Sequence, residues 1–131
     1  MSWNLSEQEL TSVLSLPGAK RYSYFIKKVA DWEEVWSLRN QDGWVLAAGP
    51  SGSEIVPVWP HKRFAEACMI GEWKDCKPAV IELSTWMERW IPGMAKDNRQ
   101  VAVFATPEDK SVVVQPVQLY AEISEECEQY E

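Results

Sequence analysis

The sequence has few cysteines, a single histidine and no long hydrophobic run. The three cysteines are Cys68, Cys76 and Cys127, and this odd count argues against the disulfide framework of a secreted domain. No stretch approaches the roughly 18 consecutive apolar residues of a membrane span. Residues 1–10 contain no apolar core of a signal peptide. We therefore expect a cytoplasmic protein with no membrane partner.

The motifs of the common enzyme classes are also missing. There is no glycine-rich phosphate loop, no nucleophile elbow and no paired-cysteine zinc pattern. Any Cys-His mechanism must use His61, and Cys68 on the same helix would lie about 10.5 Å away along the axis, beyond hydrogen-bond reach. Cys76 remains a possible partner through a loop. A zinc site from these three residues would need a fourth ligand at a nonstandard spacing, so we predict no metal and no cofactor.

Basic residues are fewer than acidic ones, and the chain carries a net charge of −7. Residues 122–131 contribute −5 of this, which leaves −2 for the rest. The body is therefore nearly balanced, and we expect no binding to nucleic acid, which needs a basic face. Four basic residues do cluster in sequence, and we expect them on the solvated face of a helix: Lys20, Arg21, Lys27 and Lys28.

Tryptophan, by contrast, is abundant. The chain has eight: Trp3, Trp32, Trp36, Trp44, Trp59, Trp73, Trp86 and Trp90. Each carries a large apolar surface and one N–H donor. We expect most of them in a core and its rim; the alternative is an aromatic-lined binding groove.

Hydrophobic periodicity and turn residues predict an α+β fold. Ser6 and Glu9 form a capping-box pattern at the start of a first helix, which a Pro-Gly break at 17–18 joins to a second helix as a helical hairpin. Later helices are expected to start at Pro60 and Pro116 and after a Ser84 cap, with a kink or a fresh turn at Pro92. Strands are predicted over residues 35–39, 44–48, 54–59, 79–83, 101–105 and 112–114.

The predicted elements fit a single domain over residues 1–131. Its expected fold is a mixed, mostly antiparallel sheet of five or six strands covered by about five helices. The first three strands read as an antiparallel meander, whose second turn is Gly49-Pro50-Ser51-Gly52. The step from 54–59 to 79–83 reads as a right-handed crossover. Residues 122–131 are expected to form an acidic tail that frays beyond about Ser124, because glutamates oppose the negative end of a helix dipole.

The most informative segment is Trp59-Pro60-His61-Lys62-Arg63, where a strand ends and a helix begins. The first turn of a helix favours anions, yet this one offers basic residues. Either carboxylates from elsewhere in the fold neutralise them, or a phosphate, a carboxylate or an acidic partner binds there.

Several motifs recur in an order that resembles a known family. They include Asp42-Gly43-Trp44, Pro57-Val58-Trp59-Pro60, Phe64-Ala65, Glu72-Trp73 and Trp90-Ile91-Pro92-Gly93-Met94. Together they resemble the bacterial family labelled domain of unknown function 2750, over residues 20–119. The resemblance implies a small stand-alone bacterial protein, and it assigns no activity and no catalytic residues.

These features favour a non-enzymatic protein that binds a protein partner or a small anion. The candidate binding residues are Trp59, His61, Lys62, Arg63 and Trp73. Neutralisation of a basic nuclease is one version of this reading, through charge complementarity. The alternatives are an enzyme with a cleft near His61, walled by Trp59 and Trp73, and an assembly role through a sheet edge or tryptophan patch.

Overall fold

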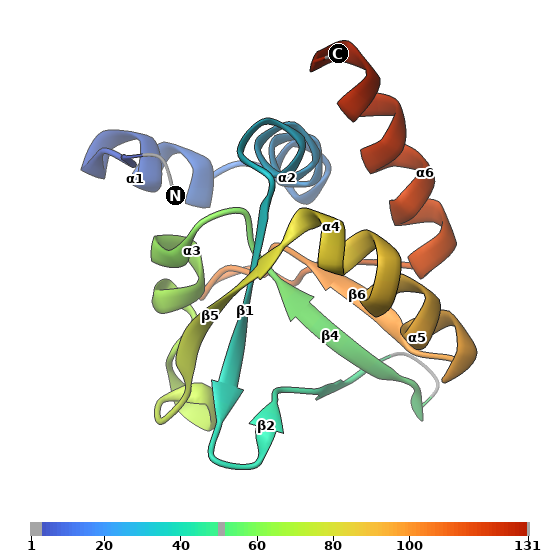
Figure 1. Ribbon diagram of the computed structural model, residues 1–131. Coiled ribbons are helices and arrows are strands. Elements are labelled where there is room, and N and C mark those ends of the chain that lie inside the picture. Colours follow the sequence, from blue (N-terminus) through green and yellow to red (C-terminus); the bar gives the residue numbers. More distant parts are fainter. Residues whose placement is uncertain (1–3, 50–51, 131) are drawn as a thin grey trace.

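Helices account for much of the chain in the computed structural model, which describes residues 4–49 and 52–130 (Figure 1). They are α1 (Glu7–Leu14), α2 (Gly18–Trp32), α3 (Lys62–Ala67), α4 (Leu83–Thr85), α5 (Ile91–Lys96) and α6 (Pro116–Cys127). A π-helical segment, Trp86–Trp90, joins α4 and α5 into one continuous helix. The prediction of about five helices is therefore confirmed.

The strands form two sheets. They are β1 (Glu34–Asn40), β2 (Gly43–Trp44), β3 (Ala47–Ala48), β4 (Glu54–Val58), β5 (Lys77–Glu82), β6 (Gln100–Val103) and β7 (Val112–Val114). One sheet has the order β2-β1-β5 and is antiparallel, and the other has the order β3-β4-β6-β7 and is mixed. The α+β class is confirmed, but the described residues form seven strands in two sheets where five or six in one sheet were predicted.

The two sheets meet at a bridge between Trp36 of β1 and Trp59, the residue after β4. Their backbones exchange hydrogen bonds of 2.9 and 2.8 Å. The predicted strand 44–48 divides next to this junction: Val45 N–H donates to Leu38 of β1, whereas Ala47 pairs with Ile55 of β4. The predicted meander is wrong because the chain changes sheets within this segment. Its second turn includes Pro50 and Ser51, which lie outside the described residues.

The predicted crossover connects the wrong strands. The strand reached after α3 is β5, which pairs with β1, so β4 and β5 belong to different sheets. The parallel neighbour of β4 is β6, with Val56 opposite Val101. Local patterning found both strands, but it carried no information on which sheet each strand joins.

Two helix starts differ from their predictions. α3 begins at Lys62, and its N-cap is His61, whose ring Nδ1 accepts the Arg63 N–H at 3.1 Å; Pro60 therefore lies outside the helix. α4 follows an N-cap at Glu82, so Ser84 lies inside the first turn. In contrast, Ser6 caps α1 as predicted, accepting the Glu9 N–H at 3.0 Å.

The helix before β6 changes its hydrogen-bonding pattern next to Pro92, where the sequence predicted a kink or a fresh turn. Pro92 has no N–H to give the carbonyl of Glu88. The preceding turns widen instead, so that Ile91 N–H donates to the carbonyl of Trp86, five residues back. Regular α-helix resumes at Ile91. Pro92 therefore lies in the first turn of α5, the place in an α-helix where a proline is best tolerated.

The acidic C-terminal segment is anchored where it begins. The Tyr22 hydroxyl of α2 donates to the carboxylate of Glu122 on α6. α6 continues past Ser124 as regular helix to Cys127, followed by a 3₁₀ turn, Glu128–Tyr130. Fraying beyond Ser124 stays a prediction.

Helices gather at one end of the sheets. Figure 1 shows α1, α2 and α6 toward one end and the β1–β2 turn at the opposite end. α1 packs on α3, and α2 packs on α6, so neither helix of the predicted hairpin has the other as its main partner. The side chains of Phe25, Trp59, Phe64, Trp86 and Phe104 are completely buried in the core between helices and sheets. Within residues 4–49 and 52–130, no helix has the length and apolarity to cross a membrane.

Candidate functional site

Trp59, the first of the predicted binding residues, is a core residue. Its side chain is fully buried, and its indole N–H donates to the carbonyl of Ala105 at 2.9 Å. Its ring meets Trp73 edge to face, with 6.0 Å between centroids. Trp73 is half-buried and lines a shallow pocket of about 270 Å³ beside Cys68 and Pro107. Trp59 therefore packs behind this pocket, against Trp73 and Ala105, which line it.

The basic helix start is largely occupied by contacts inside the fold. His61 is 6% exposed and serves as the N-cap of α3. The Arg63 guanidinium donates to the carbonyl of Leu5 at 2.9 Å and forms an ion pair with Glu7. Lys62 is exposed. The sequence left two interpretations of this segment open. For Arg63 the first one holds, because the carboxylate of Glu7 in α1 neutralises its charge.

The five predicted binding residues are not brought together in the main pockets of the described residues. Trp73 lines the pocket beside Cys68, and these pockets are not lined by Trp59, His61, Lys62 or Arg63. The missing information was long-range: Glu7 precedes Arg63 by 56 residues.

The thiol of Cys68 is held protonated at neutral pH. Burial raises its pKa to about 11, against the smaller opposing effects of a hydrogen bond with Trp59 and the charge of Arg21. Its sulfur contacts the carbonyl of Ala105 at 3.3 Å. Burial also raises the pKa of Cys76. No cluster of three or more His, Cys, Asp or Glu residues suited to a metal ion occurs within the part of the chain that the structure describes.

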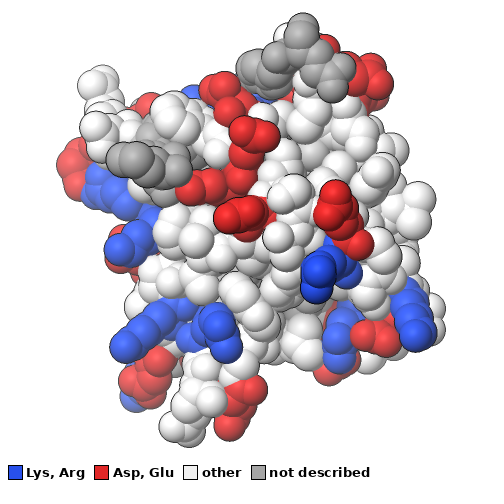
Figure 2. All heavy atoms as spheres, in the orientation of Figure 1, with Lys and Arg blue, Asp and Glu red and all other residues white. Residues whose placement is uncertain are grey.

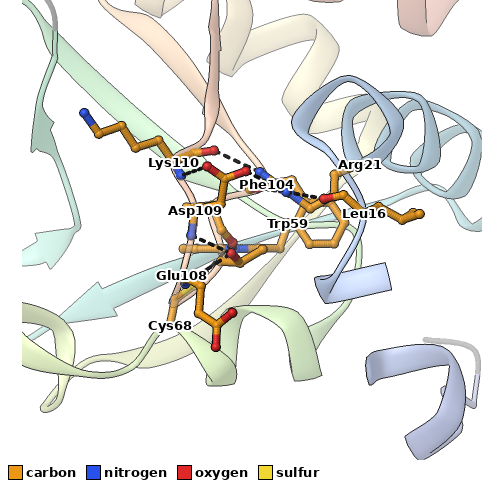
Figure 3. Close-up of polar contacts among 10 residues, drawn as sticks. Leu16, Arg21, Trp59, Cys68, Phe104, Glu108, Asp109 and Lys110 are labelled. Carbon is orange, nitrogen blue, oxygen red and sulfur yellow. Dashed lines mark hydrogen bonds and ion pairs between the residues drawn. The ribbon is translucent and has the colours of Figure 1, made fainter. Parts of the chain in front are cut away.

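Arg21 is buried, although it was expected on a solvated helix face (Figure 3). Its guanidinium donates to the carbonyls of Leu16, Phe104 and Lys110, at 2.5, 3.1 and 2.9 Å, and to the carboxylate of Asp109 at 3.1 Å. A hydrogen bond from the Lys110 backbone, and then the Arg21 guanidinium, lower the pKa of Asp109. This network fastens the segment before β7 to α2, so its charge is fully used within the fold.

An apolar groove of about 360 Å³ lies between α5 and the segment that crosses from one sheet to the other. The rings of Trp44 and Trp90 meet edge to face, with centroids 4.8 Å apart, and both line the groove. Val56 and Met94 line it as well. The wall on the helix is a single face, because Trp90, Met94 and their neighbours at positions 93 and 97 follow helical spacing. The sequence marked Trp90 only as an apolar helix position.

Gly93 lies in the middle of this helix face. Its backbone is helical, and a β-carbon added to it would meet no heavy atom within 4 Å. Neither a left-handed conformation nor a close neighbour therefore explains a glycine here. The groove is open at this position because no side chain fills it.

The rim of the groove carries two arginines in different states. Arg99 donates to Glu54 at 3.1 Å and to Asp97 at 3.4 Å, so its charge is shared with two carboxylates. Arg89 is exposed and forms no hydrogen bond or ion pair with the described residues. Figure 2 shows uncharged surface between two groups of basic side chains, one near the ends of β1 and β5 and one near the end of α5.

A family model matches most of the chain. The model of a family described as "Protein of unknown function (DUF2750)" matches residues 22–123. No curated protein matches the chain.

Proposed function

The chain belongs to the DUF2750 family of proteins of unknown function, and we propose that it is a non-catalytic binding protein for a small anionic molecule with a flat apolar body. The binding site is the groove between Trp44 and Trp90. Its volume, about 360 Å³, is within the range of small-molecule pockets. Two indole rings set edge to face offer a flat ligand both a face and an edge to stack against.

The observation that carries the proposal is Gly93. A glycine inside a helix costs about 0.5–1 kcal/mol of stability relative to alanine. Here alanine would meet no atom within 4 Å, and the backbone does not require glycine. The position lines the groove, so the only space that a larger residue takes is space inside it. A ligand that occupies the groove next to position 93 would explain why this position is glycine, although the fold does not require glycine there.

The charge of the ligand follows from the rim. The carboxylates of Glu54 and Asp97 already share Arg99. Arg89, next to the Trp90 wall, has no such partner among the described residues. A guanidinium binds a carboxylate or phosphate with two parallel hydrogen bonds. We therefore assign the anionic group of the ligand to Arg89.

An enzyme site near His61 lacks comparable support. His61 lines none of the pockets described above, and its Nδ1 is engaged as a helix cap. Trp59, the expected wall of that cleft, is completely buried.

Isothermal titration calorimetry with naphthoate and its uncharged amide tests the proposal. We expect naphthoate to bind more tightly than the amide, and Gly93→Leu to abolish binding of both by filling the groove. Ala95→Leu adds the same side chain on the exposed side of the same helix and serves as the matched control. Absence of naphthoate binding by the wild type, or equal binding by Gly93→Leu, would contradict the proposal.

A further inference from the structure

Two positive charges face each other at the open end of the three-stranded sheet. Arg39 of β1 and Lys77 of β5 are directly paired in the antiparallel register. Side chains of such a pair lie on one face of the sheet, with β-carbons about 4.5–5.5 Å apart, and like charges in this arrangement destabilise the sheet. The pair therefore opposes folding unless something negative lies beside it.

The described residues supply no ion-pair partner for either charge. Neither Arg39 nor Lys77 forms an ion pair with a carboxylate in residues 4–49 or 52–130. The Arg39 guanidinium instead lies over the ring of Trp44, 5.0 Å from its centroid. This contact holds the flat group in place and leaves its N–H donors available.

A pocket of about 490 Å³ opens beside the paired charges. Arg39 and Lys77 line it together with Asn40, Gln41 and Asp75. The side-chain oxygen of Asn40 accepts the backbone N–H of residue 42 at 2.8 Å, which orients the amide and leaves its NH₂ group as a donor. The pocket thus combines two cations and two amide groups with a single carboxylate.

We infer that this pocket binds the phosphate group of a small phosphorylated molecule, with Arg39 and Lys77 as its two cationic ligands. A phosphate carries about −1.5 to −2 charges at neutral pH, which matches two adjacent cations better than one carboxylate does. Arg39 supplies a planar fork and Lys77 a point charge. The Asp75 carboxylate repels the phosphate but accepts a hydrogen bond from a hydroxyl on the organic part. The two pockets share no lining residue, although Arg39 lies over the ring of Trp44, which lines the groove.

Thermal unfolding with inorganic phosphate and with glycerol phosphate, each against sodium chloride of equal ionic strength, tests the inference. Glycerol phosphate has hydroxyls but no flat apolar body, so it does not suit the groove between Trp44 and Trp90. We expect phosphate and glycerol phosphate to raise the melting temperature of the wild type where chloride does not. A larger effect of glycerol phosphate identifies an organic phosphate as the ligand, and an equal effect of inorganic phosphate identifies the free ion.

The decisive variant is Lys77→Glu. It converts the repelling pair into an attractive one, so we expect the protein without ligand to be more stable while its affinity for glycerol phosphate falls about tenfold or more. Lys27→Glu makes the same charge change on an exposed position of α2, at the opposite end of the molecule from the β1–β2 turn (Figure 1), and should leave the affinity unchanged.

A second measurement keeps the inference testable if melting shifts are small. Titration of phosphate into isotopically labelled protein should shift the backbone amide signals of Asn40, Gln41 and Lys77. Stabilisation by chloride equal to that by phosphate, retained affinity in Lys77→Glu, or signal changes confined to other residues would overturn the inference.

Discussion

Arg21 and Arg39 lie in regions of the molecule that treat positive charge in opposite ways. Arg21 is 1% exposed and donates to three carbonyls and one carboxylate. Arg39 is exposed, stacks on a tryptophan ring and is paired across the sheet with a lysine. In the first region, the hydrogen bonds and ion pair of Arg21 join α2 to the segment before β7. The second leaves its charge and an apolar groove open to solvent, and both of our binding proposals lie there.

Substitution of the two arginines should separate the regions most strongly. Arg21→Ala removes the donor of one buried and two partly buried carbonyls and the partner of Asp109, and we expect it to lower the free energy of unfolding by about 3 kcal/mol or more. Arg39→Ala removes one exposed ring contact and should cost less than about 1 kcal/mol. Urea unfolding followed by tryptophan fluorescence measures both.

A further variant, Arg21→Lys, separates the loss of the hydrogen bonds of Arg21 from a general loss of packing. Arg21→Lys keeps the charge and most of the apolar stem but not the planar fork, so it should still be clearly less stable than the wild type. If the Arg21 variants cost no more than Arg39→Ala, the distinction between the two regions fails.

Acid should weaken the Arg21 region through Asp109, by a smaller effect. The folded protein lowers the pKa of this carboxyl below its ordinary value of 3.8, so the contribution of Asp109 is present above that value and is lost as the pH falls through the lowered pKa. Asp109→Asn removes this titration. We expect stability to fall less steeply below about pH 4 in this variant than in the wild type. Identical acid limbs in urea titrations would contradict this account.

The sequence predicted those parts of the fold whose causes are local. Ser6 and Glu9 stand three residues apart and form the expected cap contact. A change from π-helical to α-helical hydrogen bonding accompanies Pro92, because a proline lacks a backbone donor wherever it lies. The strands β6 and β7 lie at two short apolar runs that predicted strands.

The parts that could not be predicted depend on contacts between distant segments. Arg21 reads as one member of a basic helix face until Asp109, 88 residues later, lies beside it. Arg63 likewise reads as free positive charge until α1 supplies Glu7. The groove combines Trp44 from one sheet with Trp90 from a helix, and no spacing in the sequence relates them. Charge and aromaticity identified useful residue types, but only the fold decides which of them are left unused.

The most direct test of the open groove measures stability and binding on one variant, Gly93→Ala. If the glycine serves the groove and not the fold, the alanine variant should gain up to about 1 kcal/mol in free energy of unfolding while its affinity for naphthoate falls. A variant that is less stable than the wild type, or that is more stable and binds naphthoate equally well, would contradict the account.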